Sequence, residues 1–276
     1  MILDNKITPE ETLLITFTKK AGMEMLNRLG KILPHKIPYH VGSLHGLGYK
    51  VLQEYNDINY TVLDEKDVKD FIDWFKNLGG WDQKIFISGN HDYCFERINK
   101  PSYKGMYDWL GPLMSSENLS KSDITYLEDS TFTIETPEFD RPIKFYGSPW
   151  QPWFYDWAFN LPRLGIELQE KWNMIPEDTD VLITHSPPNG YGDLVNNWRQ
   201  PNTHVGCECL INRIGEINPL VNVFGHIHEG YGVQYGDKTL FVNASICTTG
   251  YEPTNKPIVI DLVEINGKIN AIYVEE

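Results

Sequence analysis

The segment Val221-Asn-Val-Phe-Gly-His-Ile-His-Glu-Gly-Tyr-Gly-Val233 joins a short apolar run to two histidines spaced i, i+2. Its apolar residues predict a buried strand that ends at Gly225. The glycines that follow permit a tight loop, which can aim both imidazoles at one point. Because neutral imidazole is a common ligand of divalent transition metals, the segment predicts a metal site at the end of a strand.

Two further segments have the same arrangement. Ile85-Phe-Ile-Ser-Gly-Asn-His-Asp92 and Val181-Leu-Ile-Thr-His-Ser-Pro-Pro188 are apolar runs followed by Asn90-His91 and by His185. A single His-x-His pair is weak evidence for a metal. Three predicted strands that each end in Asn or His indicate one shared site.

These segments resemble the calcineurin-like metallophosphoesterase family. The family's motifs run Asp-x-His, Gly-Asp, Gly-Asn-His-(Asp/Glu), a lone His and Gly-His-x-His. The last three match Gly89-Asn-His-Asp92, His185 and Gly225-His-Ile-His228. Gly147-Ser-Pro-Trp-Gln-Pro-Trp153 and His204-Val-Gly-Cys207 are similar to the MPPED subgroup. The resemblance covers about residues 68–276.

The resemblance implies an α/β fold, a layered β-sandwich flanked by helices, with metals at the strand ends. The order of apolar patterns along the chain agrees with a layered α/β architecture. We expect helices over 68–78, 107–114, 165–172 and 207–217, and strands over 84–88, 124–134, 143–146, 181–184, 221–224, 239–243 and 258–263.

In the family, two divalent ions (manganese, zinc or iron) produce a metal-activated hydroxide that attacks phosphorus in line. By resemblance, Asn90, His185 and His226 would hold one ion, and His228 would hold the other. His91 would act as the acid that protonates the leaving oxygen. Asp92 would orient His91 through a hydrogen bond. The implied substrates are small phosphodiesters, cyclic nucleotides among them.

Two residues outside the motifs are candidate substrate contacts. Trp150 lies in an aromatic-rich stretch and could stack on a nucleobase, although packing within that stretch is the simpler explanation. Arg163 could contact phosphate or bond local backbone. Both alternatives stay open at the level of the sequence.

The first two motifs of the family, Asp-x-His and Gly-Asp, do not occur before Asn90. They supply the carboxylates of the centre, so the matching residues would hold one ion or none where the family holds two. Candidates for substitutes in the N-terminal segment are His35, His40, His45 and Asp64. A catalytically dead pseudoenzyme that binds a nucleotide or a protein is therefore the first alternative to a phosphodiesterase.

Residues 1–67 have a different pattern from residues 68–276, so we expect a domain boundary there. We expect strands over 12–18 and 38–43 and helices over 19–32 and 44–55. Leu13-Leu-Ile-Thr-Phe-Thr-Lys-Lys-Ala-Gly-Met-Glu-Met-Leu-Asn-Arg28 resembles a motif of UvrD-type superfamily 1 helicases, over about residues 9–67. The phosphate loop of those enzymes is absent. A chimeric chain with a helicase remnant that binds single-stranded DNA is the second alternative.

The amino-acid composition restricts the classes of molecule that the protein is expected to bind. The net charge of −14 disfavours non-specific binding to nucleic acid or to an anionic membrane. The four cysteines include no Cys-x-x-Cys pair, which favours reduced thiols. No apolar run reaches the length of a membrane span. We therefore expect a cytoplasmic protein that binds a small phosphoester; the sequence leaves the oligomeric state open.

Overall fold

The computed structural model describes residues 13–16, 40–43, 65–196 and 201–274. The chain divides into two compact units, Met1–Thr61 and Val62–Glu276. In the first unit, β1 (Leu13–Thr16) and β2 (His40–Ser43) form a parallel pair. Both lie within expected strands, whereas the expected helices over 19–32 and 44–55 lie outside the described residues.

The second unit is built on a six-stranded mixed sheet with the order β13-β14-β12-β9-β6-β5. Its strands are β5 (Ser130–Ile134), β6 (Ile143–Ser148), β9 (Val181–Thr184), β12 (Val221–Phe224), β13 (Gly232–Tyr235) and β14 (Leu240–Asn243). The four inner strands run parallel, and the two edge strands are antiparallel to their neighbours. Parallel strands are covered on both faces, which explains why β9, β12 and β14 are mostly apolar.

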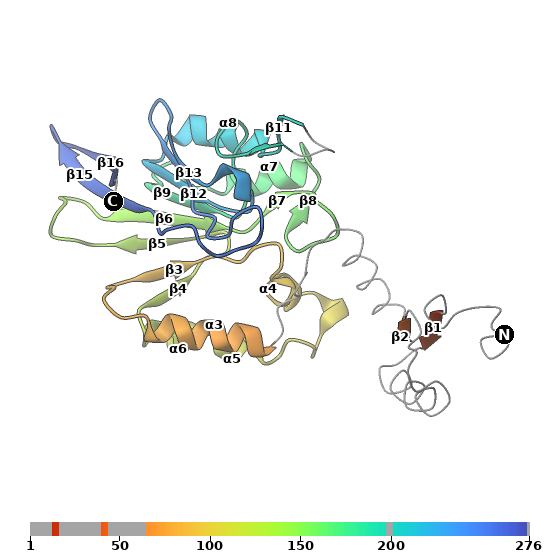
Figure 1. Cartoon of the computed structure of the whole chain (residues 1–276). Helices are drawn as coiled ribbons and strands as arrows, with labels where there is room; N and C mark the ends of the chain where they lie inside the picture. The colour runs from red at the N-terminus through yellow and green to blue at the C-terminus, as the bar shows by residue number, and fades with distance from the viewer. Residues whose placement is uncertain (1–12, 17–39, 44–64, 197–200, 275–276) are drawn as a thin grey trace. The chain divides into compact units, whose positions relative to one another are not determined.

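Each face of this sheet has its own cover (Figure 1). On one face, α7 (Ile166–Asn173) and α8 (Glu208–Ile217) pack Leu168, Trp172 and Leu210 against Leu182 and Phe224 of the sheet. A second cluster joins Val181, Val221 and Leu240 to the hairpin of β15 (Val259–Ile265) and β16 (Lys268–Val274). The sheet is therefore the centre of the core.

A smaller layer lies on the other side of β5 and β6 (Figure 1). It contains the parallel pair β3 (Lys84–Phe86) and β4 (Ile124–Tyr126). Around this pair are α3 (Glu65–Asn77), α4 (Tyr93–Arg97), α5 (Leu110–Leu113), α6 (Ser116–Ser120) and the short 3-10 turn η2 (Pro101–Tyr103). Val68, Ile72, Leu110, Leu119 and Ile124 form its buried core.

Short elements carry the loops between these layers. They are β7 (Gln151–Pro152), β8 (Asn160–Leu161), β10 (Leu194–Val195), β11 (Thr203–His204) and the 3-10 turn η3 (His228–Gly230). Within the described ranges, no helix has the length and apolar character needed to cross a membrane.

The layered α/β architecture expected from the sequence is confirmed, with local corrections. The single strand expected over 124–134 is two strands, β4 and β5, in different sheets. Asp129 separates them in a left-handed conformation (φ 47°), and its carboxylate accepts hydrogen bonds from Ser148 and Trp150. The helix expected over 107–114 is shorter, Leu110–Leu113. Strands β13 and β16 were not expected.

Close contact between the two layers depends on Gly147 of β6. A Cβ atom there would lie 2.4 Å from Leu127 Cβ and 2.7 Å from Ile87 Cγ2. Real Cβ atoms do not approach other atoms so closely, so the absent side chain sets the spacing between the large sheet and the β3–β4 layer.

Substituting Gly147→Ala should lower the free energy of unfolding by about 2–3 kcal/mol, because the added methyl group overpacks the layer interface. Urea denaturation monitored by circular dichroism measures the change. The matched control is Gly215→Ala in α8, where nothing lies within 4 Å of the added Cβ. That variant should gain about 0.5–1 kcal/mol, since alanine favours a helix interior. Equal stability of the two variants would contradict the packing argument.

Candidate functional site

The candidate site forms where β3, β9 and β12 end. Strands β9 and β12 are parallel neighbours with Val181 opposite Val221, so His185 and Gly225 follow their strands at the same level. The Gly225 backbone N–H donates a hydrogen bond to the His185 carbonyl over 3.0 Å. This register places His185 and His226 side by side, with ring centroids 4.8 Å apart.

Asn90 reaches the same place from β3. Its Oδ1 lies 2.8 Å from His185 Nε2. This approach requires Gly89, because a Cβ there would be 2.7 Å from His185 Cε1. The Asn90 side chain is buried, and its Nδ2 has no hydrogen-bond partner among the described residues. A buried donor without a partner is costly, which indicates that a ligand atom completes it.

The turn that carries His226 and His228 is held from two sides. His226 adopts φ 67°, a conformation that few residues other than glycine favour. Asn243, at the end of β14, donates from Nδ2 to the Ile227 carbonyl (2.8 Å) and the Gly192 carbonyl (3.0 Å). His228 Nδ1 lies 3.0 Å from the Thr248 carbonyl. Since a carbonyl only accepts, Nδ1 carries the proton and Nε2 keeps its lone pair.

Three of the imidazoles, those of His91, His185 and His226, have lowered pKa values. Burial, reinforced by the nearby His226 and His91, lowers the pKa of His185 well below its ordinary value. Burial and the charges of His91 and His228 lower the pKa of His226 to about 4. The pKa of His91 is lowered by burial and by His228. Neutral rings keep the lone pairs that a metal ligand needs.

The expected acid and its partner lie beside these ligands. The His91 ring is 4.9 Å from the Trp157 ring. The Asp92 carboxylate accepts a 2.5 Å hydrogen bond from the Gly89 backbone N–H, so it shapes the turn that presents Asn90 and His91. Burial raises the pKa of Asp92 to about 6, against the opposing effect of that hydrogen bond.

Trp150 and Arg163, the candidate substrate contacts, bind groups of the protein itself. Trp150 Nε1 donates to Asp129 over 2.9 Å, and the Lys171 ammonium lies 4.4 Å from the indole centroid. Arg163 donates to the Gly206 carbonyl over 2.8 Å and pairs with a glutamate of α8. Because these contacts hold both side chains against other parts of the protein, the geometry favours the packing interpretation for both.

Sequence reasoning did not select Asn243, although the signal was present. Like Asn90 and His185, Asn243 stands at the carboxyl end of an apolar strand. Phe154 lies in the aromatic stretch that begins at Trp150 but was not selected within it, and Tyr251 was missed. Their rings contact His226 and His228, respectively, from loops that no local pattern connects to the histidines.

The donor set fits one divalent ion. Two ligands of the same ion, each at about 2.0–2.2 Å and roughly at right angles, lie about 3 Å apart. The 2.8 Å separation of Asn90 Oδ1 and His185 Nε2 meets this requirement, and His226 adjoins them. Within the described ranges, no three His, Cys, Asp or Glu side chains gather as a metal-binding group. The described residues therefore bring together neutral donors for at most one ion and do not fit the family's pair.

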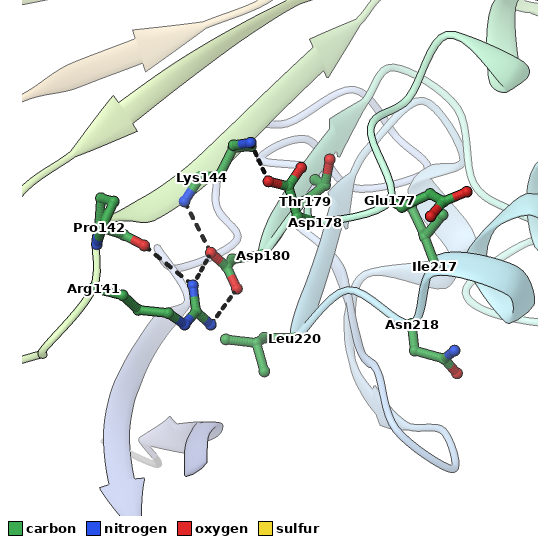
Figure 2. A pocket seen from close by; sticks show the side chains of 10 residues that line it. All are labelled: Arg141, Pro142, Lys144, Glu177, Asp178, Thr179, Asp180, Ile217, Asn218 and Leu220. Carbon is green, nitrogen blue, oxygen red and sulfur yellow. Dashed lines mark hydrogen bonds and ion pairs between the residues drawn. The ribbon is translucent and has the colours of Figure 1, made fainter. Parts of the chain in front are cut away.

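A hollow lies at the opposite ends of these strands (Figure 2). This pocket of about 470 Å³ is lined by residues that precede β6, β9 and β12, among them Arg141, Asp180 and Leu220. Arg141 makes two 2.7 Å hydrogen bonds to Asp180, and Lys144 pairs with Asp178. Because these charges neutralise one another, the pocket is a weaker candidate than the histidine end.

The fold and this histidine end define a metallophosphoesterase domain. The chain is 44% identical over 237 residues to Metallophosphoesterase domain-containing protein 1 of Homo sapiens, and equally to that of Mus musculus. Each alignment covers 80% of this chain and 69% of the relative. A UPF0046 protein of Caenorhabditis elegans is 36% identical over 194 residues, covering 65% of this chain and 46% of that protein. The chain therefore belongs to the family of metallophosphoesterase domain-containing proteins.

The N-terminal region has a different relationship. The UvrD/REP helicase N-terminal domain family matches residues 1–123. Both resemblances expected from the sequence are thus confirmed. The helicase match extends past residue 67, the expected boundary, and covers less than half of the chain.

Substituting Gly89→Ala should weaken manganese binding about 10- to 100-fold, because the new methyl group displaces the His185 ring from Asn90. Competition with a metal-binding dye measures the affinity. Gly79→Ala, which adds a methyl group to open space, is the control. Unchanged manganese affinity in Gly89→Ala would remove Asn90 and His185 from the site.

Acid should destabilise the metal-free protein through His226. Its folded pKa of about 4 lies below the unfolded value near 6.5, so its contribution to stability is present above pH 6.5 and is lost as the pH falls through 4. Asparagine tolerates a positive φ, so the His226→Asn variant should fold. Its free energy of unfolding should fall about 1–2 kcal/mol less over this pH window than that of the wild type. Urea denaturation with a chelator, at pH 7 and at pH 4.5, measures it.

Asp92 provides a control, because its contribution to stability changes with pH in the opposite direction. Its folded pKa of about 6 lies above the unfolded value, so its contribution is present below about pH 4 and is lost as the pH rises through 6. Asp92→Asn should therefore make the acid loss steeper. Identical pH dependence in both variants would contradict the assigned protonation states.

Proposed function

We propose that this chain is a metal-dependent phosphoesterase that hydrolyses phosphodiester bonds in small substrates. Asn90 carries the proposal. Its oxygen lies 2.8 Å from a neutral histidine nitrogen, and its buried amide nitrogen has no partner among the described residues. One side chain thus offers an acceptor to a cation and a donor to an oxygen atom beside it. A phosphoester bound at a metal supplies such an oxygen.

The roles of the other residues follow from their contacts. A divalent ion (manganese, zinc or iron) held by Asn90, His185 and His226 would lower the pKa of water and offset charge on the phosphoryl oxygens. Asn243 keeps the His226–His228 turn in position through its bond to the Ile227 carbonyl. His228 presents Nε2 from the edge of the cluster, because Nδ1 bonds the Thr248 carbonyl.

His91 is the proposed proton donor. Without a ligand its pKa is lowered, so the ring is mostly neutral. An anionic phosphoester beside it favours the protonated ring and opposes that shift. His91 would therefore acquire its proton together with the substrate and deliver it to the leaving oxygen.

A specific observation favours a second function, a phosphoester-binding protein without catalysis. No carboxylate joins Asn90 and the histidines within the part of the chain that the structure describes. The second ion of the family's centre would have only His228 as a described ligand. A pseudoenzyme would keep the ligand pocket while hydrolysis is lost.

Charge and thiols suggest the setting in which either function would operate. The net charge of −14 argues against nucleic acid as the partner and in favour of a small phosphoester screened by a bound cation. All four cysteines are unpaired, which suits the reducing cytoplasm.

The purified chain, loaded with manganese and desalted, should hydrolyse bis(4-nitrophenyl) phosphate in a manganese-dependent reaction. His91→Gln should lower this turnover about 10²- to 10⁴-fold, which is the usual loss for a general acid. Elemental analysis should find the same manganese content in wild type and variant, because the proposed ligands are retained. Absorbance of released nitrophenolate measures the rate.

The two functions give different results in this assay. Bound manganese with no turnover would contradict the catalytic function and favour the function of a phosphoester-binding protein. Turnover that His91→Gln does not change would assign the acid to another residue. An absence of bound manganese and of phosphoester binding would remove both functions.

A further inference from the structure

Gly225 faces the same side of the large sheet as His185. Successive side chains of a strand point to opposite faces, so residues two apart share a face. Ile183 and Val223 pack into one apolar cluster, and they are followed two residues later by His185 and Gly225, respectively. A side chain at position 225 would therefore point into the space beside the His185 ring. Glycine leaves this space open.

A hydroxyl group borders the open space. A Cβ atom on Gly225 would meet one heavy atom of the described residues within 4 Å, apart from its chain neighbours, and that atom is Ser245 Oγ at 3.5 Å. Ser245 is 7% exposed, and its hydroxyl has no hydrogen-bond partner among the described residues. Because a buried hydroxyl without a partner is costly, a ligand atom that accepts its proton would be bound favourably.

The backbone of Ser245 is held on both sides. The Ala244 N–H donates to the Phe224 carbonyl over 2.7 Å, which extends the pairing of β14 with β12 past the strand ends. The Ser245 N–H donates to Asn243 Oδ1 over 3.1 Å, and Asn255 Nδ2 donates to the Ser245 carbonyl over 2.8 Å. The reach of the hydroxyl is therefore fixed before a ligand arrives, which lowers the entropy cost of binding.

One side chain fixes Ser245 relative to the proposed metal ligands. Asn243 accepts from the Ser245 N–H through Oδ1, while its Nδ2 donates to the Ile227 carbonyl in the turn between His226 and His228. The hydroxyl and the two imidazoles are thus positioned by the same amide group. Donors that are oriented in advance bind an anion more strongly than donors that must reorganise.

We propose that Ser245 binds the phosphoester by donating a hydrogen bond to a phosphoryl oxygen that occupies the space beside Gly225. The inference rests on the proposed function, because the phosphate group would be bound at the histidine end. A phosphoryl oxygen carries negative charge and accepts such a bond strongly. A hydroxyl is a suitable donor beside a cation, since it adds no charge and can rotate toward the oxygen that it meets.

Inorganic phosphate is the probe that tests this assignment. Titration calorimetry on the full chain, loaded with manganese and desalted, measures the dissociation constant of phosphate. Ser245→Ala should raise this constant about tenfold, because a hydrogen bond to a charged group contributes at this level. The affinity for manganese without phosphate, measured with a metal-binding dye, should stay at the wild-type value, since the hydroxyl is not a proposed metal ligand.

The stability of the ligand-free protein separates a binding hydroxyl from a structural one. Alanine removes a buried donor that lacks a partner among the described residues, so Ser245→Ala should keep or raise the melting temperature of the metal-free protein. A melting temperature several degrees below that of wild type would assign the hydroxyl to the packing of the protein and overturn the proposal.

Gly225→Ala tests the open space itself. The added Cβ would lie 3.5 Å from Ser245 Oγ, which is an ordinary contact distance, so this variant should fold. Its methyl group would fill the place of the phosphoryl oxygen. Phosphate should therefore bind about tenfold more weakly, or less, to the manganese-loaded variant, and wild-type affinity would show that no phosphoryl oxygen lies there.

The matched control is Ser186→Ala. The Ser186 hydroxyl is also buried and without a partner among the described residues. Ser186 follows Thr184 by two residues, and the Thr184 hydroxyl lies 3.4 Å from Asn222 Nδ2, on the face opposite to Val223. The loss of the Ser186 hydroxyl should leave the affinity for phosphate unchanged.

The outcomes separate this inference from the proposed function. Unchanged phosphate affinity in Ser245→Ala, an equal loss in Ser186→Ala, or a parallel loss of manganese affinity in Ser245→Ala would overturn the role of Ser245 and leave the proposed function intact. Failure of the manganese-loaded wild type to bind phosphate would overturn both.

Discussion

The hydrogen bond from the Gly225 N–H to the His185 carbonyl is the contact on which the site depends. This bond continues the parallel register of β9 and β12 by one residue beyond the strands, where His185 and His226 leave the sheet. A shift of one residue in either strand would send one imidazole to the opposite face of the sheet. The covered, apolar faces of both strands fix that register, so burial in the core determines the geometry of the ligands.

The histidine cluster could be predicted because its signal is local. Asn90, His185 and His226 each follow an apolar run, and the carboxyl ends of parallel strands collect at one edge of a sheet. Interactions between distant segments left no such signal. Trp150 bonds Asp129, which lies 21 residues earlier, and Arg163 bonds Gly206, which lies 43 residues later. The same Asp129 divides the expected strand over 124–134, since its turn depends on partners that the local pattern does not show.

Within the described residues, the smaller layer is less completely covered than the large sheet. Among the described strands, β3 pairs only with β4, while the large sheet has both faces covered. The neighbouring helix α3 exposes Trp74 by 57% and Phe71 by 36%. The core that positions His185 and His226 is thus covered on both faces by described residues.

At the proposed site, a neutral ligand set would couple the binding of a cation to the binding of a phosphoester. Because Asn90, His185 and His226 carry no negative charge, a divalent ion held by them would keep its full charge in a half-buried place. That charge is costly to desolvate alone and is offset by an anionic ligand. Each of the two ligands should therefore raise the affinity of the site for the other by the same factor. In the proposed arrangement, a bound phosphoester would therefore tighten the binding of a cation that the neutral ligands already hold.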